Sequence, residues 1–389
     1  MNYLVMALHL LNFITPQMQQ SFVQIYHAAG ALTEQSAVVT SQEAQGYIDN
    51  ANHVSARAAL DFLNERGQRA RELLRPKDVE RQQMGLLSSE QFELLKPKLE
   101  QLGFVEPITP KQRTFDAVLI LGATETGCRQ RMKLFAQLAP ELTFKHIYLV
   151  TGKRDLWPND SGNKTKGENI TLHLVLRCIN EKYSLHSHTS KSTCSHNLTK
   201  EQLQAEFDAV FSEIDYTDGV QVNAARKQII ADVTARYGIT WPTETDMMLE
   251  LSNQALGQYR DRISVVDTPK GKEGARPTTL TSLEYLNQQH SLNSALVISA
   301  QPVAKYQCAI AQTTLPATKV DLAANGTICM PTNITQVLEA LYAFVYAQKM
   351  YLEASGLIES AAIQAAKASS PDDKLLVFKP TLTLERRAA

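Results

Sequence analysis

The chain contains a continuous apolar run that is followed at once by a polar loop with a glycine at each end. The run covers residues 117–121, and the loop is Gly122-Ala123-Thr124-Glu125-Thr126-Gly127. A run that is apolar on both faces is typical of a parallel strand with helices on each side. Glycine after such a strand lets backbone amides approach a ligand, and the next helix directs its positive end at any anion there. The sequence therefore predicts a small-molecule site near residue 122.

Beyond about residue 114, short apolar runs alternate with helical segments, which predicts an α/β fold with a Rossmann-like parallel sheet. The predicted strands are residues 117–121, 147–150, 263–266 and 295–298, with two further possible strands at 319–323 and 327–329. Polar residues follow each of the first four runs. Because the carboxyl ends of parallel strands meet at one edge of the sheet, where such folds bind ligands, we expect these residues to converge there.

The remaining regions are predicted to be largely helical. The predicted order is a helical region 1–110 with a capping box at Ser88 to Gln91, a core 111–330 interrupted by an insertion 155–240, and a C-terminal helix and polar tail 331–389. Helical patterns cover residues 44–74, 200–214, 222–237 and 335–354. We expect the insertion to form a helical cap over the strand ends, because such elements control access to a site and exclude water from it.

Bulk composition excludes several classes of function. With 39 basic and 40 acidic residues, the net charge of -1 predicts no nucleic-acid partner and no electrostatic attraction to a membrane. The apolar N-terminal stretch is interrupted by His9 and Asn12, and no run reaches the roughly 18 residues that a membrane span needs. Five cysteines at irregular spacing make no disulfide framework and favour a reducing compartment. We therefore expect a cytoplasmic protein.

Charged and hydroxyl side chains at the predicted strand ends and helix starts are the candidate site residues. Glu125 and Glu244 are candidates to orient or deprotonate a ligand, and Arg131, Lys153 and Arg276 are candidates to hold negative charge. The other candidates for ligand contact are Gly122, Ala123, Thr124, Thr151, Gly152, Thr278, Thr279, Ser299 and Gln301. Helix capping, a favourable helix dipole or a solvated loop would equally account for several of them.

Three motifs with established chemistry are absent or incomplete. The loop after residue 121 is neither a GxGxxG fingerprint nor a P-loop, and Ser299 lacks the G-x-S-x-G elbow of an esterase nucleophile. His186, His188, Cys194 and His196 could supply nitrogen and sulfur ligands to zinc. Their spacing matches no closed zinc module and the segment is rich in Ser and Thr, so an exposed loop is the favoured interpretation.

The order of these motifs resembles the YdcF/SanA-like family, a domain of unknown function (DUF 218), over residues 115–155 and 240–312. The matching segments are Leu121-Gly122-Ala123 with Arg131, Val150-Thr151-Gly152, the acidic helix start Pro242-Thr243-Glu244-Thr245-Asp246, Arg276-Pro277-Thr278-Thr279, and Val297-Ile298-Ser299-Ala300-Gln301. The chain departs from the family pattern at the second glycine of each Gly-Gly pair, which is Ala123 or Lys153. It also lacks the His/Arg pair of the last helix, where Val303 and Lys305 or Gln307 stand.

The resemblance implies a Rossmann-like domain whose pocket binds a nucleotide-like or anionic small molecule, with S-adenosylmethionine as one suggested ligand. An enzyme of this kind would be a transferase or hydrolase acting on a nucleotide-like or phosphorylated compound. The alternative is a non-catalytic interaction protein that has kept a degenerate pocket and binds a protein partner through its helical ends. The substituted Gly-Gly and His/Arg positions favour this alternative.

Overall fold

The computed structural model describes residues 102–159, 170–187, 198–216, 218–328 and 334–354, together with a few positions between 64 and 100. The chain divides into two compact units, one of residues 71–341 and the other of residues 1–70 and 342–389. The fold below is that of the unit 71–341. The predicted capping box at Ser88 to Gln91 and nearly all of the pattern at 44–74 lie outside the described residues.

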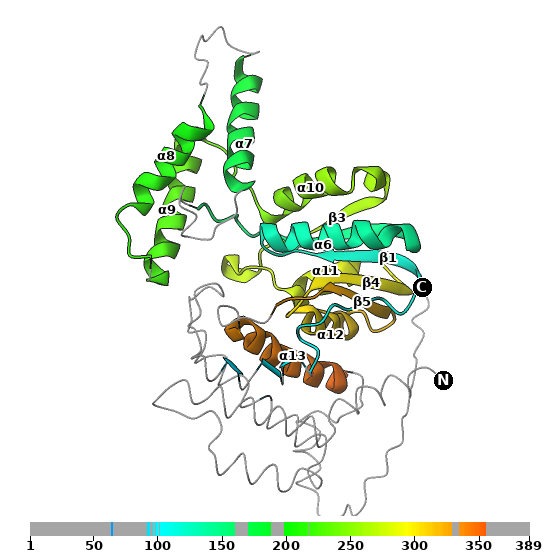
Figure 1. Cartoon of the computed structure of the whole chain (residues 1–389). Coiled ribbons are helices and arrows are strands. Elements are labelled where there is room, and N and C mark those ends of the chain that lie inside the picture. Colours follow the sequence, from blue (N-terminus) through cyan, green and yellow to red (C-terminus); the bar gives the residue numbers. More distant parts are fainter. Residues whose placement is uncertain are drawn as a thin grey trace, which may run out of the picture. The chain divides into compact units, whose positions relative to one another are not determined.

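A five-stranded parallel sheet forms the centre of this unit (Figure 1). Its strands are β1 (Thr114–Leu121), β2 (Thr143–Gly152), β3 (Ile263–Thr268), β4 (Ser294–Ala300) and β5 (Lys319–Asn325). The spatial order is β3-β2-β1-β4-β5, and every neighbouring pair is parallel. The prediction of an α/β fold with a Rossmann-like parallel sheet is therefore confirmed. Each of the five predicted strands up to residue 323 lies within an observed strand.

Four helices cover the two faces of the sheet (Figure 1). They are α6 (Glu125–Leu138), α10 (Glu244–Ala255), α11 (Thr279–Gln289) and α12 (Ala304–Thr314). Helix α6 packs on β1, β4 and β5, and α10 packs beside it on β2 and β3. On the other face α11 contacts β2 and β3, while α12 contacts β4 and β5. A sheet covered in this way buries both faces of its central strands, which accounts for the unbroken apolar run of β1.

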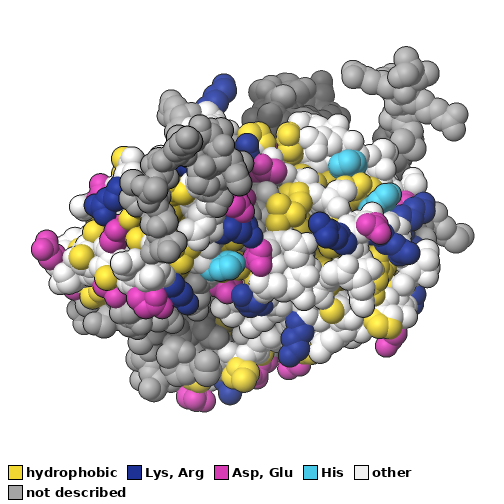
Figure 2. All heavy atoms as spheres, turned by 90° about the horizontal axis from the view of Figure 1, so that it is seen from above, with side chains coloured by type: hydrophobic (Ala, Val, Ile, Leu, Met, Phe, Trp, Pro, Cys, Tyr) yellow, Lys and Arg dark blue, Asp and Glu magenta, His cyan; other side chains and the backbone are white. Residues whose placement is uncertain are grey.

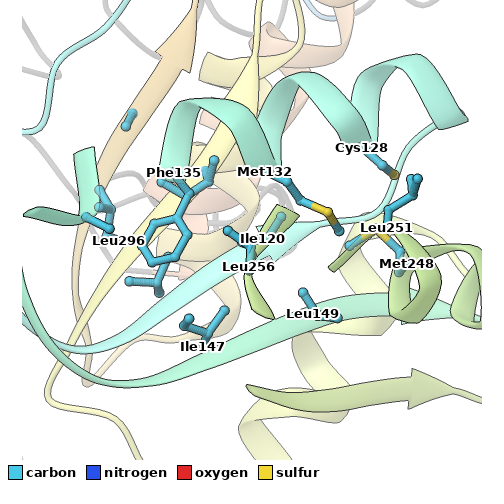
Figure 3. Close-up of a cluster of buried hydrophobic side chains, with 14 of the residues drawn as sticks. Ile120, Cys128, Met132, Phe135, Ile147, Leu149, Met248, Leu251, Leu256 and Leu296 are labelled. Carbon is cyan, nitrogen blue, oxygen red and sulfur yellow. The ribbon is translucent and has the colours of Figure 1, made fainter. Parts of the chain in front are cut away.

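The core under α6 and α10 follows from the spacing of apolar residues on α6. Cys128, Met132 and Phe135 lie on one side of the helix because they are three and four residues apart. Figure 3 shows them directed at strand residues such as Ile120 and Leu149. All five side chains have no exposed surface. Truncating a fully buried aromatic residue such as Phe135 to alanine would cost about 3–5 kcal/mol of stability.

The insertion is a separate helical layer with its own hydrophobic core. Its helices are α7 (Ile170–Ser187), α8 (Lys200–Phe211) and α9 (Gly219–Tyr237). Most of their buried side chains form a second cluster, whereas Ile170 and Leu174 of α7 belong to the core under α6. Thr199 and Asp218 cap the starts of α8 and α9, and Gly238 ends α9 in the left-handed conformation, with φ of 59°. The predicted helical patterns at 200–214 and 222–237 are confirmed.

The possible strand at 327–329 is wrong for the two residues that the structure describes. Thr327 and Ile328 lie outside any strand, and the Thr327 amide donates to the Val105 carbonyl at 2.8 Å. Cys329 lies outside the described residues. The described residues also form three short 3₁₀ helices and a long helix, which are η4 (Ala139–Glu141), η5 (Gly257–Arg262), η6 (Lys272–Gly274) and α13 (Ile334–Ala354).

Surface charge is mixed in sign on the face seen in Figure 2, where Lys and Arg side chains alternate with Asp and Glu. This face has no broad basic stripe of the kind that nucleic-acid binding requires. None of the helices in the described part of the chain is both long enough and apolar enough to cross a bilayer.

Candidate functional site

The strand order places a topological switch point between β1 and β4. From β1 the chain proceeds through α6 to β2 on one side, whereas β4 pairs with β1 on the other side. Open α/β sheets bind ligands in the crevice outside the carboxyl ends of the strands at such a point. Gly122 follows β1, Gly152 ends β2 and Ala300 ends β4. The predicted site residues on these segments are therefore brought to one edge of the sheet.

At the switch point itself, a buried polar cluster of Arg131, Ser299 and Gln307 joins the two faces of the sheet. Arg131 Nη1 donates to the carbonyl oxygens of Leu121 and Gly122 at 2.6 and 2.7 Å. The Gln307 side-chain oxygen accepts from Arg131 Nη2 at 3.2 Å and from the Ser299 hydroxyl at 2.5 Å. Arg131 is 3% exposed and Ser299 has no exposed surface. These two predicted ligand contacts instead hold the ends of β1 and β4 together.

Gln301 also binds the protein itself. Its side-chain amide nitrogen donates to the carbonyls of Gly103 and Glu106, both at 3.0 Å, and its backbone amide donates to the Asn325 carbonyl. The segment preceding β1 is thereby fastened to the ends of β4 and β5. The β1–β4 side of the edge is thus largely occupied by protein groups bonded to one another, although Gln301 Oε1 is buried without a hydrogen-bond partner in the described part of the structure.

On the other side of β1, three residues form a row across the ends of β1, β2 and β3. Thr151 and Asp267 are register partners, and Gly122 lies beside Thr151 because its amide bonds to the Val150 carbonyl at 2.8 Å. Alternation along the strands places this row on the face that α10 covers. The Thr245 hydroxyl, in the first turn of α10, donates to Asp267 Oδ1 at 2.6 Å. We call Gly122, Thr151 and Asp267 the α10-facing row.

Glu244 begins α10 and places its carboxylate against Gly122. A Cβ atom at Gly122 would lie 2.3 Å from Glu244 Oε1, so a larger residue there would displace this carboxylate. Glu244 Oε2 lies 3.5 Å from Arg154 Nε, and the two side chains are 12% and 10% exposed. The Glu244 amide donates to the Arg154 carbonyl at 2.8 Å, which fixes the helix start over the end of β2.

Lys153 is the exposed cation of this region. Its side chain is 54% exposed and its ammonium nitrogen lies 3.6 Å from Asp267 Oδ2. Together, Glu244, Asp267, Arg154 and Lys153 place two carboxylates and two cations at the ends of β1, β2 and β3. Such a site can accept hydrogen bonds from a ligand and can also bind a negative group.

The predicted residues before α11 are more peripheral. A Cβ at Gly152 would lie 2.6 Å from Pro277 Cβ, so this glycine makes room for the proline rather than for a ligand. Thr278 caps α11, accepting from the Thr281 amide at 3.2 Å, and Thr279 is the first residue of the helix. Arg276 is exposed. The hydroxyl of Thr278 therefore has a structural role in capping.

Glu125 links α6 to the insertion. Its Oε1 accepts from Arg129 Nε and Nη2 at 2.9 and 2.8 Å, and its Oε2 accepts from the amide of Ile170, the first residue of α7, at 2.9 Å. Both oxygens of this predicted catalytic residue thus bind protein groups. Thr124 is the extended N-cap residue of α6, but its side chain makes no capping bond.

Cys128 lies under the loop and is not an activated nucleophile. Its Sγ donates to the Ala123 carbonyl at 3.3 Å. Burial, reinforced by the negative charge of Glu244, raises the pKa of the Cys128 thiol to about 12. A nucleophilic cysteine needs a lowered pKa, so the thiol remains protonated near neutral pH.

Two threonine hydroxyls at this edge are buried without a hydrogen-bond partner in the described part of the structure. They belong to Thr151 and Thr268, which are 3% and 4% exposed. Buried hydroxyls in native proteins nearly always bind protein, water or a ligand. Thr151 lies within the α10-facing row beside Asp267, so this hydroxyl is on the face of the sheet that the start of α10 covers.

Among the described residues, no three or more His, Cys, Asp or Glu side chains are grouped so as to hold a metal ion. The four residues that were considered as zinc ligands and interpreted as an exposed loop cannot be placed, because the side chain of His186 and all of His188, Cys194 and His196 lie outside the described residues. Sequence reasoning did not select Thr245 or Asp267 as site residues. Asp267 directly follows the predicted strand 263–266 and is one of the polar residues expected to converge at this edge, although it was not named as a ligand contact.

Comparisons of the chain with protein-family models, curated proteins and solved structures find no match. The evidence for a ligand site is therefore the geometry of the sheet edge.

Proposed function

We propose that this chain binds a small nucleotide-like or anionic molecule at the carboxyl ends of β1, β2 and β3, as the resemblance to the YdcF/SanA-like family implies. S-adenosylmethionine is one candidate ligand. The observation that carries the proposal is the placement of Glu244, Asp267, Arg154 and Lys153 at the ends of β1, β2 and β3, where Thr151 is the register partner of Asp267 and has a buried hydroxyl without a hydrogen-bond partner among the described residues.

Mixed charge suits a ligand that has both hydrogen-bond donors and a negative group. Carboxylates accept from hydroxyl or amine groups, while lysine and arginine bind carboxylate or phosphate. A nucleoside-like ligand with one acidic group has both features. We assign no reaction, because the described residues bring together no nucleophile, base and orienting group in mutual contact.

The alternative is a non-catalytic interaction protein, and a specific observation favours it. Arg131, Ser299 and Gln307 fill the switch point between β1 and β4, where a Rossmann-like fold would ordinarily take its ligand. In that case the helical ends of the chain would bind a protein partner.

A thermal-shift screen of the full chain would separate the two functions. The compounds are S-adenosylmethionine, S-adenosylhomocysteine, nucleotides and sugar phosphates. A ligand at 100 times its Kd would add about 2.7 kcal/mol of stability and raise the Tm visibly. The proposal expects a hit that is lost in Asp267→Asn and kept in the control Glu284→Gln, which changes an exposed residue of α11. If no compound raises the Tm of the well-folded protein and pull-downs recover a stable protein complex, the alternative is supported.

A further inference from the structure

The position of Glu244 restricts what can bind next to the β1 loop. Its carboxylate fills the space beside Gly122, where a Cβ atom would come within 2.3 Å of Oε1. In dinucleotide-binding folds the glycine loop after the first strand accepts a pyrophosphate. Here the Glu244 carboxylate, which is paired with Arg154 and only 12% exposed, already occupies the space that a phosphate would need. A phosphate is therefore disfavoured beside Gly122.

The same region is rich in hydrogen-bond acceptors. Glu244 and Asp267 supply carboxylate oxygens at the two ends of the α10-facing row. Between them, the Thr151 hydroxyl is buried and has no partner in the described part of the structure. Ionised carboxylates accept only, whereas a hydroxyl can donate or accept. This arrangement complements a ligand with hydroxyl groups, and an acidic side chain near the strand ends is the usual partner of ribose hydroxyls in such folds.

The exposed cation lies on the outer side of the row. Lys153 is 54% exposed and is 3.6 Å from Asp267. A negative group of the ligand would thus be held toward solvent, away from Gly122. In a phosphate-binding glycine loop the negative group of the ligand lies beside the glycine, whereas here it would lie beside Lys153.

We propose that the ligand is a nucleoside-type molecule that presents its ribose diol to Glu244, and that no phosphate binds beside Gly122. This inference rests on the proposed function, since it concerns the same site. It selects nucleosides and their singly charged derivatives over polyphosphates.

Isothermal titration of the unmodified full chain tests the inference directly. The probes are adenosine, 2′,3′-dideoxyadenosine and inorganic pyrophosphate. We expect adenosine to bind and dideoxyadenosine to bind at least tenfold more weakly, because hydrogen bonds to charged groups contribute about that factor or more. Pyrophosphate should not bind. Equal binding of the two nucleosides, or pyrophosphate binding more tightly than adenosine, would overturn the inference while leaving a ligand site in place.

A variant that removes the charge of Glu244 tests whether this carboxylate accepts from the ribose diol. In Glu244→Gln we expect the preference for adenosine over dideoxyadenosine to shrink to less than about threefold, whereas Glu250→Gln, elsewhere on α10, should keep the full preference. An unchanged preference in a Glu244→Gln protein with a native-like melting curve would show that the diol lies elsewhere. If neither these probes nor the compounds of the thermal-shift screen bind to the unmodified chain, the proposed function itself fails and this inference falls with it.

Discussion

On the β1–β4 side of the carboxyl edge, Arg131 is 3% exposed and donates to two backbone carbonyls and to Gln307. On the β1–β3 side, Lys153 is 54% exposed and its nearest carboxylate is 3.6 Å away. Both residues were predicted from the sequence to hold a negative ligand. The difference shows that a cation near a strand end can be part of the scaffold or part of a site, and that burial and bonding decide which.

Among the variants considered, replacement of Arg131 should cause the largest loss in the free energy of unfolding. Arg131→Met would leave the Leu121 and Gly122 carbonyls without their donor, and unpaired buried polar groups are costly. We expect a loss of about 3 kcal/mol in the free energy of unfolding, measured by urea denaturation. The matched control is Arg129→Met on the same helix, whose side chain is 49% exposed and should cost under about 1 kcal/mol. Similar costs for the two variants would contradict a scaffold role for Arg131.

The two strand-end glycines should differ in the cost of adding a methyl group. In Gly152→Ala the new Cβ would meet the Pro277 ring at 2.6 Å, and a proline ring has little freedom to move. In Gly122→Ala it would meet only the end of the flexible Glu244 side chain. We expect a loss of about 2 kcal/mol for Gly152→Ala and of about 1 kcal/mol or less for Gly122→Ala, both from urea denaturation.

A double variant tests whether the cost at Gly122 comes from Glu244. In a Glu244→Ala background, Gly122→Ala should become nearly neutral, since neighbouring residues that clash give non-additive effects. Additive costs would mean that another group limits the space at Gly122.

The smallest effect on stability is expected at the opposite, amino end of the sheet. The ion pair between Lys145 and Asp116 at the surface there serves as a reference. The pKa of Asp116 is lowered from 3.8 to about 2, chiefly by the hydrogen bond from Lys145 and also by the Asn293 amide. Because the folded-state pKa is lowered, its contribution to stability is present above pH 3.8 and is lost as the pH falls through about 2. In Lys145→Met the carboxyl should titrate closer to 3.8 in an NMR experiment, with little change in Tm. An unaltered titration would assign the shift to Asn293.

Many strands and helices could be predicted because the apolar patterns that indicate them lie within short stretches of sequence. The run 117–121 is apolar without interruption, and only a strand covered on both sides needs that pattern. The helical spacing of Cys128, Met132 and Phe135 is equally local. The segment at 327–328 was wrongly predicted as a strand because the Thr327 amide bonds outside the sheet, to the Val105 carbonyl, which no local pattern reveals.

The site could be predicted only in part. The placement of polar residues at the strand ends follows from topology, and Lys153 was selected in that way, whereas Glu244 was selected as the acidic start of a helix. The roles of Arg131 and Ser299 could not be predicted, because they depend on Gln307, which is far from Arg131 in the sequence and meets both side chains only after the sheet closes. Likewise, the partner of Gly122 is Glu244, on a helix that follows the entire insertion.

The two backbone segments that lead into and out of the insertion lie side by side. Asp155 and Thr243 form an isolated β-bridge, and the Leu156 amide donates to the Pro242 carbonyl at 3.1 Å. Most of the buried side chains of the insertion pack against one another, but Ile170 and Leu174 of α7 pack into the core under α6. An engineered deletion of the helical layer would therefore have to fill the space of these two side chains. A short turn in its place would still lead β2 into α10, and the same junction is a suitable point for grafting a foreign domain with closely spaced termini.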